Sequence, residues 1–311
     1  MELFRKTSRI PFMATRRYWY VVSVVVILGS LALLAVRSLN FGIDFTGGVV
    51  LEFAFPEAAD LDAVRSALAE AGYEDAQVQN FGTSRDIMVR VLPRENRDTN
   101  QISAELQATL RALDADVELR RTEVVGPQVG KELTEQGGLA MLFTFVMILI
   151  YIGFRFEKKL AIGAVVAALH DPIVILGFFA ATQITFDLSV LAALLAVIGY
   201  SINDTVVVFD RVRENFLSMR KTPSAEVLDA SINQTLSRTL ITSGATLLVV
   251  IVLLLVGGET LKGFSIALIV GILIGTYSSI YIASALALEM KLSARDLMPP
   301  QKDTSEIDAL P

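Results

Sequence analysis

The sequence predicts a polytopic α-helical membrane protein with six transmembrane helices and a small α+β domain between the first and second of them. Three observations predict this class: 53% of the 311 residues are hydrophobic, only 19% are charged, and the mean hydropathy is +0.55. Soluble domains have about a quarter of their residues charged. The apolar residues also fall into runs that can cross a bilayer, whose core of about 30 Å needs about 20 helical residues.

Six apolar runs have the length of a membrane-spanning helix. They are Tyr18–Leu39, Gly137–Phe154, Leu160–Thr182, Leu188–Phe209, Thr239–Val256 and Gly263–Leu288. The first run is too long for a cleavable signal peptide and no small-x-small cleavage site follows it, so we interpret it as a retained anchor. The other five spans form a predicted bundle over residues 134–290.

Lysine and arginine predict the orientation, because positive charge near a span end is kept on the cytoplasmic side. Residues 1–17 contain five basic residues against the single acid Glu2. Further basic residues lie between the second and third spans and between the fourth and fifth. The set is Arg5, Lys6, Arg9, Arg16, Arg17, Arg155, Lys158, Lys159, Arg211, Arg213, Arg220, Lys221 and Arg238. Both termini are therefore predicted to be cytoplasmic, the second as a tail over residues 291–311.

Residues 40–133 are then placed outside the membrane, and their pattern predicts alternating strands and helices. The predicted strands are Val49–Phe55, Ala76–Phe81, Asp86–Leu92 and Asp116–Val125, with a turn at Gly82–Ser84 between the middle two. This segment has seventeen acidic and nine basic residues between positions 40 and 132, and solubility is the simplest interpretation of that charge.

Two helices complete this outer segment. Asp60 is expected to cap a helix that runs to Ala71, with Gly72 in the C′ position. The second helix is predicted over Thr99–Leu113, and its apolar face comprises Ile102, Leu106, Leu110 and Leu113. The order β-α-β-β-α-β predicts a ferredoxin-like α+β domain.

Composition excludes several classes of function. The net charge of −6 argues against nucleic-acid binding, and the absence of cysteine excludes disulfides, thiolate metal sites and cysteine nucleophiles. A single histidine excludes a multi-histidine metal site. Gly126–Gly130 is not followed by the Lys-Ser/Thr of a P-loop, and no Gly-x-Ser-x-Gly elbow occurs.

Ionisable residues inside spans are costly and therefore indicate function. Asp171 lies near the middle of the third span, between His170 and Pro172. The proline removes a backbone hydrogen bond and leaves a polar environment that water can enter. The alternative is a purely structural kink, in which the aspartate satisfies the freed backbone groups.

The fourth span ends in a second group of polar residues. Asp204 and Arg211 are seven residues apart and share one helical face, and Asn203 and Asp210 form the adjacent stripe. Together with Asp171 they predict a graded set of polar groups from the bilayer centre to the cytoplasm, which can carry protons. For Asp210 and Arg211 an interfacial ion pair at a helix end is the alternative.

An intramembrane aspartyl protease needs two aspartates on facing spans, but the Tyr-Asp and Gly-x-Gly-Asp contexts of that family are absent. The pair Gly271 and Gly275 permits close helix approach, and packing within the bundle is its expected use.

Five segments together resemble the SecF family of bacterial protein-export subunits. They occur along the chain in the same order as in that family. The segments are Phe41–Gly48, Val125–Glu132, His170–Asp171, Gly199–Asn215 and Arg238–Ser243. The resemblance implies a non-enzymatic subunit of the SecDF complex, within a superfamily of proton-driven exporters, with protons as the coupling ion and no other cofactor. It places the outer domain in the periplasm and the chain in the bacterial inner membrane.

The resemblance also implies partners. SecD supplies the other half of the transporter, and the complex uses the proton-motive force to assist late-stage export through the SecYEG channel. YajC and YidC are further candidate partners, together with exported unfolded polypeptides and membrane lipids, and nucleic acid is not one. Two rival functions stay open, a subunit of a proton-driven small-molecule exporter and a non-conducting assembly scaffold of the channel.

In that family, intramembrane Asp and Arg residues are implicated in proton conduction. Carried over to this sequence, this implies Asp171, Asp204 and Arg211 as the main relay residues, with His170, Asn203 and Asp210 beside them. The connections between the outer domain and the spans carry the remaining predicted residues, which are expected to act as hinges: Gly42, Asp44, Gly47, Gly48, Gly126 and Gly130.

Overall fold

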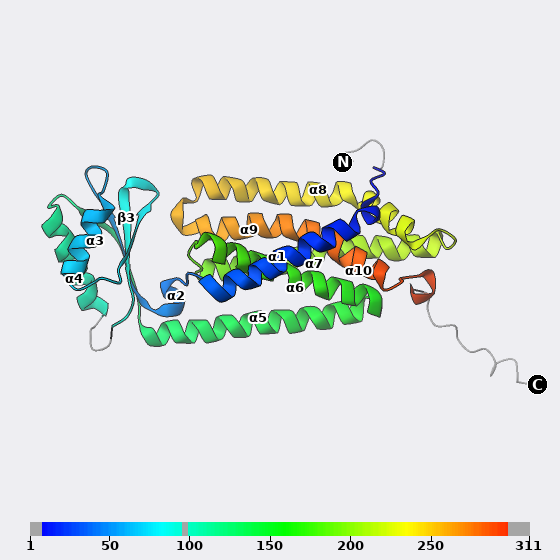
Figure 1. Cartoon of the computed structure of the whole chain (residues 1–311), viewed down its shortest axis with the longest axis horizontal. Coiled ribbons are helices and arrows are strands. Elements are labelled where there is room, and N and C mark those ends of the chain that lie inside the picture. The colour runs from blue at the N-terminus through cyan, green and yellow to red at the C-terminus, as the bar shows by residue number, and fades with distance from the viewer. Residues whose placement is uncertain (1–7, 95–98, 298–311) are drawn as a thin grey trace, which may run out of the picture.

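The computed structural model describes residues 8–94 and 99–297 as a helical bundle with a small α+β domain at one end (Figure 1). Residues 1–7, with Arg5 and Lys6, and residues 298–311, most of the predicted C-terminal tail, lie outside the described part of the chain. Residues 95–98 lie outside it as well.

Six helical segments are long and apolar enough to cross a membrane, which confirms the predicted class. They are α1 (Arg16–Arg37), α5 (Pro127–Arg155), α6 (Lys158–Thr182), α7 (Leu188–Ser218), α8 (Ser224–Val256) and the segment Gly258–Glu289. The last segment comprises α9 (Gly258–Ser278), a π-helical turn (Ser279–Ala283) and α10 (Ser284–Glu289).

Several helices extend beyond the predicted spans. Helix α5 starts at Pro127 rather than at Gly137, so it begins inside the segment assigned to the outer domain. Helix α8 starts at Ser224 rather than at Thr239. Both extensions are polar, and their helical hydrogen bonding continues where the apolar run has stopped.

Burial separates a central group of helices from a peripheral one. In the most apolar windows of α6 and α7, 61% and 56% of the residues are buried, against 11% for both α1 and α5. The α5–α6 and α7–α8 connections lie at the end of the bundle away from the α+β domain (Figure 1). Lys158 is the first residue of α6, and Lys221 lies between α7 and α8. The predicted inner loops therefore share one end.

Close packing of α9 on α7 depends on two glycines. A Cβ at Gly271 would lie 2.3 Å from Cγ2 of Val197, and a Cβ at Gly275 would lie 2.9 Å from Cβ of Ser201. This confirms that the pair is used for packing within the bundle.

The α+β domain contains a four-stranded antiparallel sheet. Its strands are β1 (Gly48–Ala54), β2 (Gln77–Phe81), β3 (Thr83–Val91) and β4 (Glu118–Val125), in the order β2-β3-β1-β4. With α3 (Leu61–Glu70) and α4 (Thr99–Leu113), this is the predicted split β-α-β-β-α-β arrangement. Strand β3 starts at Thr83 rather than at Asp86, because Gly82, at φ +79°, completes a tighter turn than predicted.

Helices α3 and α4 cover one face of this sheet and bury its core (Figure 1). Asp60 caps α3 through the amides of Asp62 and Ala63, and Gly72 follows in the positive-φ position, as predicted. The predicted apolar face of α4 needs one correction. Leu113 is 42% exposed, because it is the last helical residue, so the buried face ends at Leu110.

Candidate functional site

Asp171 lies in the centre of the bundle, fully buried on α6. The next residue, Pro172, lacks the N–H that would bond the carbonyl of Ala168 in the turn below. A carboxylate in such a place must be hydrogen-bonded, because an unpartnered charge is very costly there.

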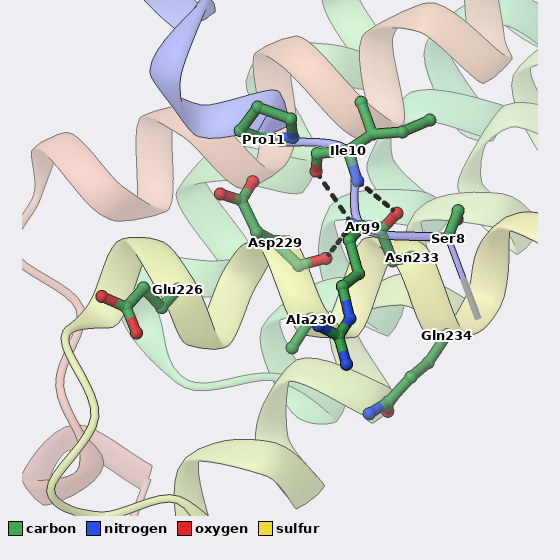
Figure 2. A pocket seen from close by; sticks show the side chains of 9 residues that line it. All are labelled: Ser8, Arg9, Ile10, Pro11, Glu226, Asp229, Ala230, Asn233 and Gln234. Carbon is green, nitrogen blue, oxygen red and sulfur yellow. Dashed lines mark hydrogen bonds between the residues drawn. The ribbon is translucent and has the colours of Figure 1, made fainter. Parts of the chain in front are cut away.

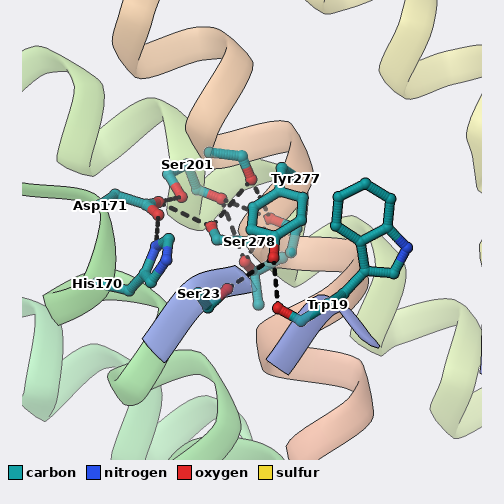
Figure 3. Close-up of polar contacts among 10 residues, drawn as sticks. Trp19, Ser23, His170, Asp171, Ser201, Tyr277 and Ser278 are labelled. Atoms are coloured by element: carbon teal, nitrogen blue, oxygen red, sulfur yellow. Dashed lines mark hydrogen bonds and ion pairs between the residues drawn. The ribbon is translucent and has the colours of Figure 1, made fainter. Parts of the chain in front are cut away.

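The Asp171 carboxylate accepts hydrogen bonds from side chains on three helices (Figure 3). Oδ2 accepts from the hydroxyls of Ser201 on α7, at 2.5 Å, and Ser278 on α9, at 2.9 Å. Oδ1 lies 2.9 Å from Nδ1 of His170. The carboxylate thus joins all three central helices of the bundle.

A second polar group continues from this site toward α1. The hydroxyl of Tyr277 lies 2.6 Å from that of Ser23 and donates to the carbonyl of Trp19 at 2.9 Å (Figure 3). The rings of Tyr277 and His170 have their centres 6.1 Å apart. Nε2 of His170 is buried and has no hydrogen-bond partner among the described residues. Among the described residues, the hydrogen bond of the His170 ring is therefore made through Nδ1 alone.

Hydroxyl groups also extend from Asp171 along α7 in the other direction. Thr205 on α7 contacts Ser279 at 2.8 Å, and both side chains lie within reach of the carbonyl of Ser201. Ser279 is the first residue of the π-helical turn, a wide turn that is frequent at functional sites.

Asp204 is a second buried carboxylate, 3% exposed, on α7. Its Oδ2 has no hydrogen-bond partner among the described residues. The hydroxyl of Ser243 on α8, which acts on the same carboxylate, contacts the hydroxyls of Thr276 at 3.1 Å and Tyr200 at 3.4 Å. The charge of Arg238, also on α8, acts on it electrostatically. The crevice beside it, which Thr239 and Thr276 also line, has no room for a water molecule.

The other predicted relay residues lie outside this centre. Asn203 is exposed on the outer surface of α7. Asp210 pairs with Arg155 at the end of α5, and Arg211 pairs at 2.9 Å with Glu214 on its own helix. The structure therefore brings His170 and Asp171 into contact and places Asp204 nearby, but the cation beside Asp204 is Arg238 rather than Arg211.

Sequence reasoning missed four residues of this centre: Ser201, Ser278, Arg238 and Ser243. Hydroxyl side chains are common in membrane helices, and only the packing decides which of them face a carboxylate. Arg238 falls in a predicted loop, because the predicted fifth span begins one residue later. The feature that places Arg238 in a helix is the helical pattern, which continues upstream to Ser224.

The predicted hinge glycines form a packed joint between the domain and the bundle. Helix α2 (Ile43–Thr46) connects α1 to β1, and Gly47 follows it at φ +69°. A Cβ at Gly130 of α5 would lie 2.7 Å from the amide nitrogen of Gly47. A Cβ at Gly48 would lie 2.4 Å from the carbonyl oxygen of Val91. These glycines therefore allow close approach of two connecting segments.

The same joint is fixed to the α6–α7 connection. Oδ2 of Asp44 accepts a hydrogen bond of 3.0 Å from the amide of Leu188, and the amide of Gly42 donates to the carbonyl of Phe186 at 2.8 Å. A Cβ at Gly42 would lie 3.1 Å from Cβ of Asp187. By contrast, Gly126 precedes α5 as its N-cap and has open space around it.

Arg90 links the sheet to this joint. It is 7% exposed on β3, and its guanidinium donates to Thr46 at 3.1 Å and to Asn40 at 3.4 Å. Burial lowers the pKa of Arg90, and the charge of Asp44 opposes that shift. Among the described residues, no group of three or more His, Cys, Asp or Glu side chains is arranged to hold a metal ion.

Two family models match the chain. Residues 105–293 match the family described as protein export membrane protein SecD/SecF, C-terminal. Residues 32–55, which include α2, match the SecD/SecF GG motif.

Curated relatives match over nearly the whole chain. A protein translocase subunit SecF from Vibrio alginolyticus is 49% identical over 100% of this chain and 99% of its own length. The corresponding subunit from Escherichia coli O157:H7 is 44% identical over 93% of this chain and 90% of its own length.

Two solved structures have the same architecture. The crystal structure of SecDF from Thermus thermophilus, a translocon-associated membrane protein, is 34% identical and superposes with a TM-score of 0.84 over 93% of this chain. SecDF in its super-membrane-facing form gives a TM-score of 0.70 at the same identity and coverage. In both cases this chain spans 40% of the length of the solved chain.

Proposed function

Because the chain belongs to the SecF family of protein translocase subunits, we propose that it serves protein export and that it uses the proton-motive force to do so. In this proposal it pairs with SecD, and the pair completes late-stage export through the SecYEG channel. SecD supplies the remaining part of the transporter, as in the SecDF chains that this protein resembles. YajC and YidC are further proposed partners.

The observation that carries the proton-driven part is the pair of buried carboxylates, Asp171 and Asp204. Both lie in central helices of a membrane bundle, and hydroxyl groups surround them. Keeping such a group in a membrane is costly, so a purely structural bundle would do better without it. No other cofactor is needed in the proposal, because protons are the coupling ion.

Protonation of either carboxylate changes which contacts hold the central helices together. A charged Asp171 is a strong acceptor for Ser201 and Ser278 on two neighbouring helices, and a neutral one is a weaker acceptor. A charged Asp204 attracts Arg238 on α8, and a neutral one does not. Proton binding and release thus bias the packing of α6, α7, α8 and α9.

Movement of these helices reaches the outer domain through the packed joint at Gly47 and Gly130. The membrane potential supplies about 2.3 kcal/mol per elementary charge per 100 mV, which is enough to bias a two-state element. In the proposed orientation the α+β domain is periplasmic, both termini are cytoplasmic, and the membrane is the bacterial inner membrane. The exported chain is then drawn outward as the domain moves.

The experiment measures late-stage export of a secretory protein into membrane vesicles that contain SecYEG, SecD and this chain, with and without a proton gradient. We expect Asp171→Asn and Asp204→Asn each to remove the stimulation by the gradient. Arg238→Met and Arg211→Met, compared in the same vesicles, decide which arginine is coupled to the carboxylates. The matched control is Glu226→Gln, which neutralises an exposed carboxylate on α8, the helix that carries Arg238.

Wild-type stimulation by the gradient in both aspartate variants would contradict the proton-driven function. That result would favour the rival scaffold function, in which these carboxylates can be neutralised without effect. Recovery of SecD with each variant shows that a loss of export does not come from failed assembly.

A further inference from the structure

A cleft of about 620 Å³ separates the sheet of the α+β domain from the bundle. Its walls are the sheet face that α3 and α4 leave uncovered, the α6–α7 connection and the start of α9. Figure 1 shows that this side of the sheet is turned toward the bundle. This volume is within the range of ligand-binding pockets. The contacts described for the relay and for the packed joint do not fill it.

Two cross-strand rows of side chains form the sheet wall. Gln79, Met88, Glu52 and Arg121 are paired in register across all four strands. The second row, in the same order of strands, is Gln77, Arg90, Val50 and Glu123. Since paired residues on neighbouring strands share a face, all eight line the cleft.

The β1–β4 half of this wall is occupied by its own ion pairs. Arg121 pairs with Glu123 and lies 3.6 Å from Glu52. On the opposite wall, Glu259 and Lys262 of α9 pair at 3.0 Å. These charges satisfy one another, so they offer little to a ligand.

The β2–β3 half is different, because its polar groups are free. The side chains of Gln77 and Gln79 are exposed and make no hydrogen bond among the described residues. Each amide can donate and accept at once, which is what a peptide backbone requires of a partner. Met88 lies beside Gln79, and methionine adapts its shape to varied apolar groups.

Arg90 adds a buried donor to the same half. Its Nε is buried and has no hydrogen-bond partner among the described residues, although the other nitrogens bond Thr46 and Asn40. A buried N–H without an acceptor is unfavourable by roughly 1–3 kcal/mol. A carbonyl oxygen of a bound chain would satisfy it.

We propose that the β2–β3 half of this cleft binds an extended segment of exported polypeptide, through Gln77, Gln79, Met88 and Arg90. The proposal rests on the proposed export function. Free amides and a methionine recognise backbone and varied side chains rather than one sequence, which suits a client of many sequences. The position of the cleft also suits this client, because a chain that leaves a channel in the same membrane emerges at the end of the spans where the cleft lies.

The absence of cysteine from the chain makes a direct test possible. Gln79→Cys introduces one thiol in the cleft. Ser66→Cys introduces one at an exposed position of α3, which lies on the other side of the sheet from the cleft. Each variant is combined with SecD and SecYEG in vesicles. The probe is a secretory precursor with one cysteine in its mature part, arrested midway by a folded C-terminal domain.

We expect oxidation to link the arrested precursor to Gln79→Cys and not to Ser66→Cys. Equal linkage at both positions, no linkage at Gln79→Cys, or linkage to SecD in place of the precursor would each overturn the proposal. Export stimulated by the proton gradient is measured in the same vesicles. If that stimulation persists while Gln79→Cys captures nothing, the cleft proposal fails and the export function stands.

A second variant tests the chemistry of the site. Gln77→Ala, Gln79→Ala and Met88→Ala together leave the ion pairs of β1 and β4 in place. We expect them to slow late-stage export and to weaken the cross-link formed from a thiol at Thr185→Cys, on the opposite wall of the cleft. Unchanged cross-linking and export in this triple variant would contradict the assignment of these side chains.

Discussion

The hydroxyl of Ser201 donates a hydrogen bond of 2.5 Å to Oδ2 of Asp171, across the interface between α7 and α6. Both residues are almost fully buried, so the carboxylate cannot exchange this donor for water without a local opening. The contact connects the fourth span to the site that the sequence singles out in the third.

Ser201→Ala should therefore destabilise the bundle by roughly 1–2 kcal/mol, because a buried carboxylate loses one of its donors. Membrane hydrogen bonds average less than this, but a carboxylate is a stronger acceptor than a neutral group. The measurement is denaturant or thermal unfolding of the purified protein in detergent. Ser218→Ala, which removes a hydroxyl bonded within the exposed end of the same helix, is the control. Equal stability of the two variants would contradict the prediction.

Gly271→Ala should also destabilise the bundle, but by overpacking. The added Cβ would lie 2.3 Å from Cγ2 of Val197, and α9 would have to move away from α7, which costs roughly 1–3 kcal/mol. Gly244→Ala on α8 is the matched control, since nothing lies within 4 Å of its Cβ position. That variant should gain up to about 1 kcal/mol from helix propensity.

The two substitutions are expected to change the stability of the protein in opposite directions, so one measurement distinguishes them. Thermal unfolding in detergent should give a lower midpoint for Gly271→Ala and an equal or higher midpoint for Gly244→Ala. A midpoint for Gly271→Ala that equals that of the parent would show that α9 does not pack on α7 this closely.

We expect the contact that Asp296 makes between α6 and the 3₁₀ turn after α10 to depend on pH. Burial alone would raise its pKa, but hydrogen bonds from Lys159 and Ser293 outweigh this and lower the pKa below its usual range. A carboxyl group with a lowered folded pKa stabilises the protein above its unfolded pKa of about 3.9. That contribution is lost as the pH falls through the folded value.

Asp296→Asn should therefore lower stability at neutral pH, by about 1 kcal/mol or less for such a half-exposed pair. The difference between the variant and the parent should begin to shrink below about pH 4 and should vanish as the pH falls through the lowered folded pKa. Unfolding midpoints between pH 3 and pH 7 measure this, with Asp62→Asn, a 90% exposed carboxylate, as the control. A difference between variant and parent that is constant with pH would rule out this linkage.

The spans and the α+β domain could be predicted because each depends on local sequence patterns. Apolar runs of membrane length identify the helices, and α4 has the predicted bounds Thr99–Leu113. The polar starts of α5 and α8 could not be predicted in this way. A helix that extends beyond the bilayer keeps its backbone hydrogen bonds, but its sequence no longer contains the apolar run that identifies a span.

The candidate site was predictable only in part, for a related reason. Asp171 is detectable from sequence because a carboxylate in the middle of a span is rare. Its partners Ser201 and Ser278 depend on how α7 and α9 rotate against α6, which the close packing at Gly271 and Gly275 determines. Periodicity places Arg211 on the face of Asp204, but the long side chain pairs locally with Glu214.

The cleft between sheet and bundle is bridged by one contact that can be tested in isolation. Nη1 of Arg121 on β4 donates to the hydroxyl of Thr260 at the start of α9, at 3.0 Å. The packed joint at Gly47 and Gly130 lies on the connections to α1 and α5, so this bond is a separate link between the domain and the bundle. Thr260→Val keeps the side-chain shape and removes the acceptor.

Thr260→Val should let the domain tilt away from the bundle more often, and a half-buried thiol placed at Met88→Cys should then react faster with maleimide. A hydrogen bond to a charged group contributes roughly 1.5 kcal/mol, so the rate should rise by up to about tenfold. Thr182→Val is the matched control, because that hydroxyl also borders the cleft but bonds the carbonyl of Phe178 on its own helix. Equal labelling rates in Thr260→Val and in the parent would show that the Arg121 contact does not restrain the domain, and the cleft would then open by movement at the joint alone.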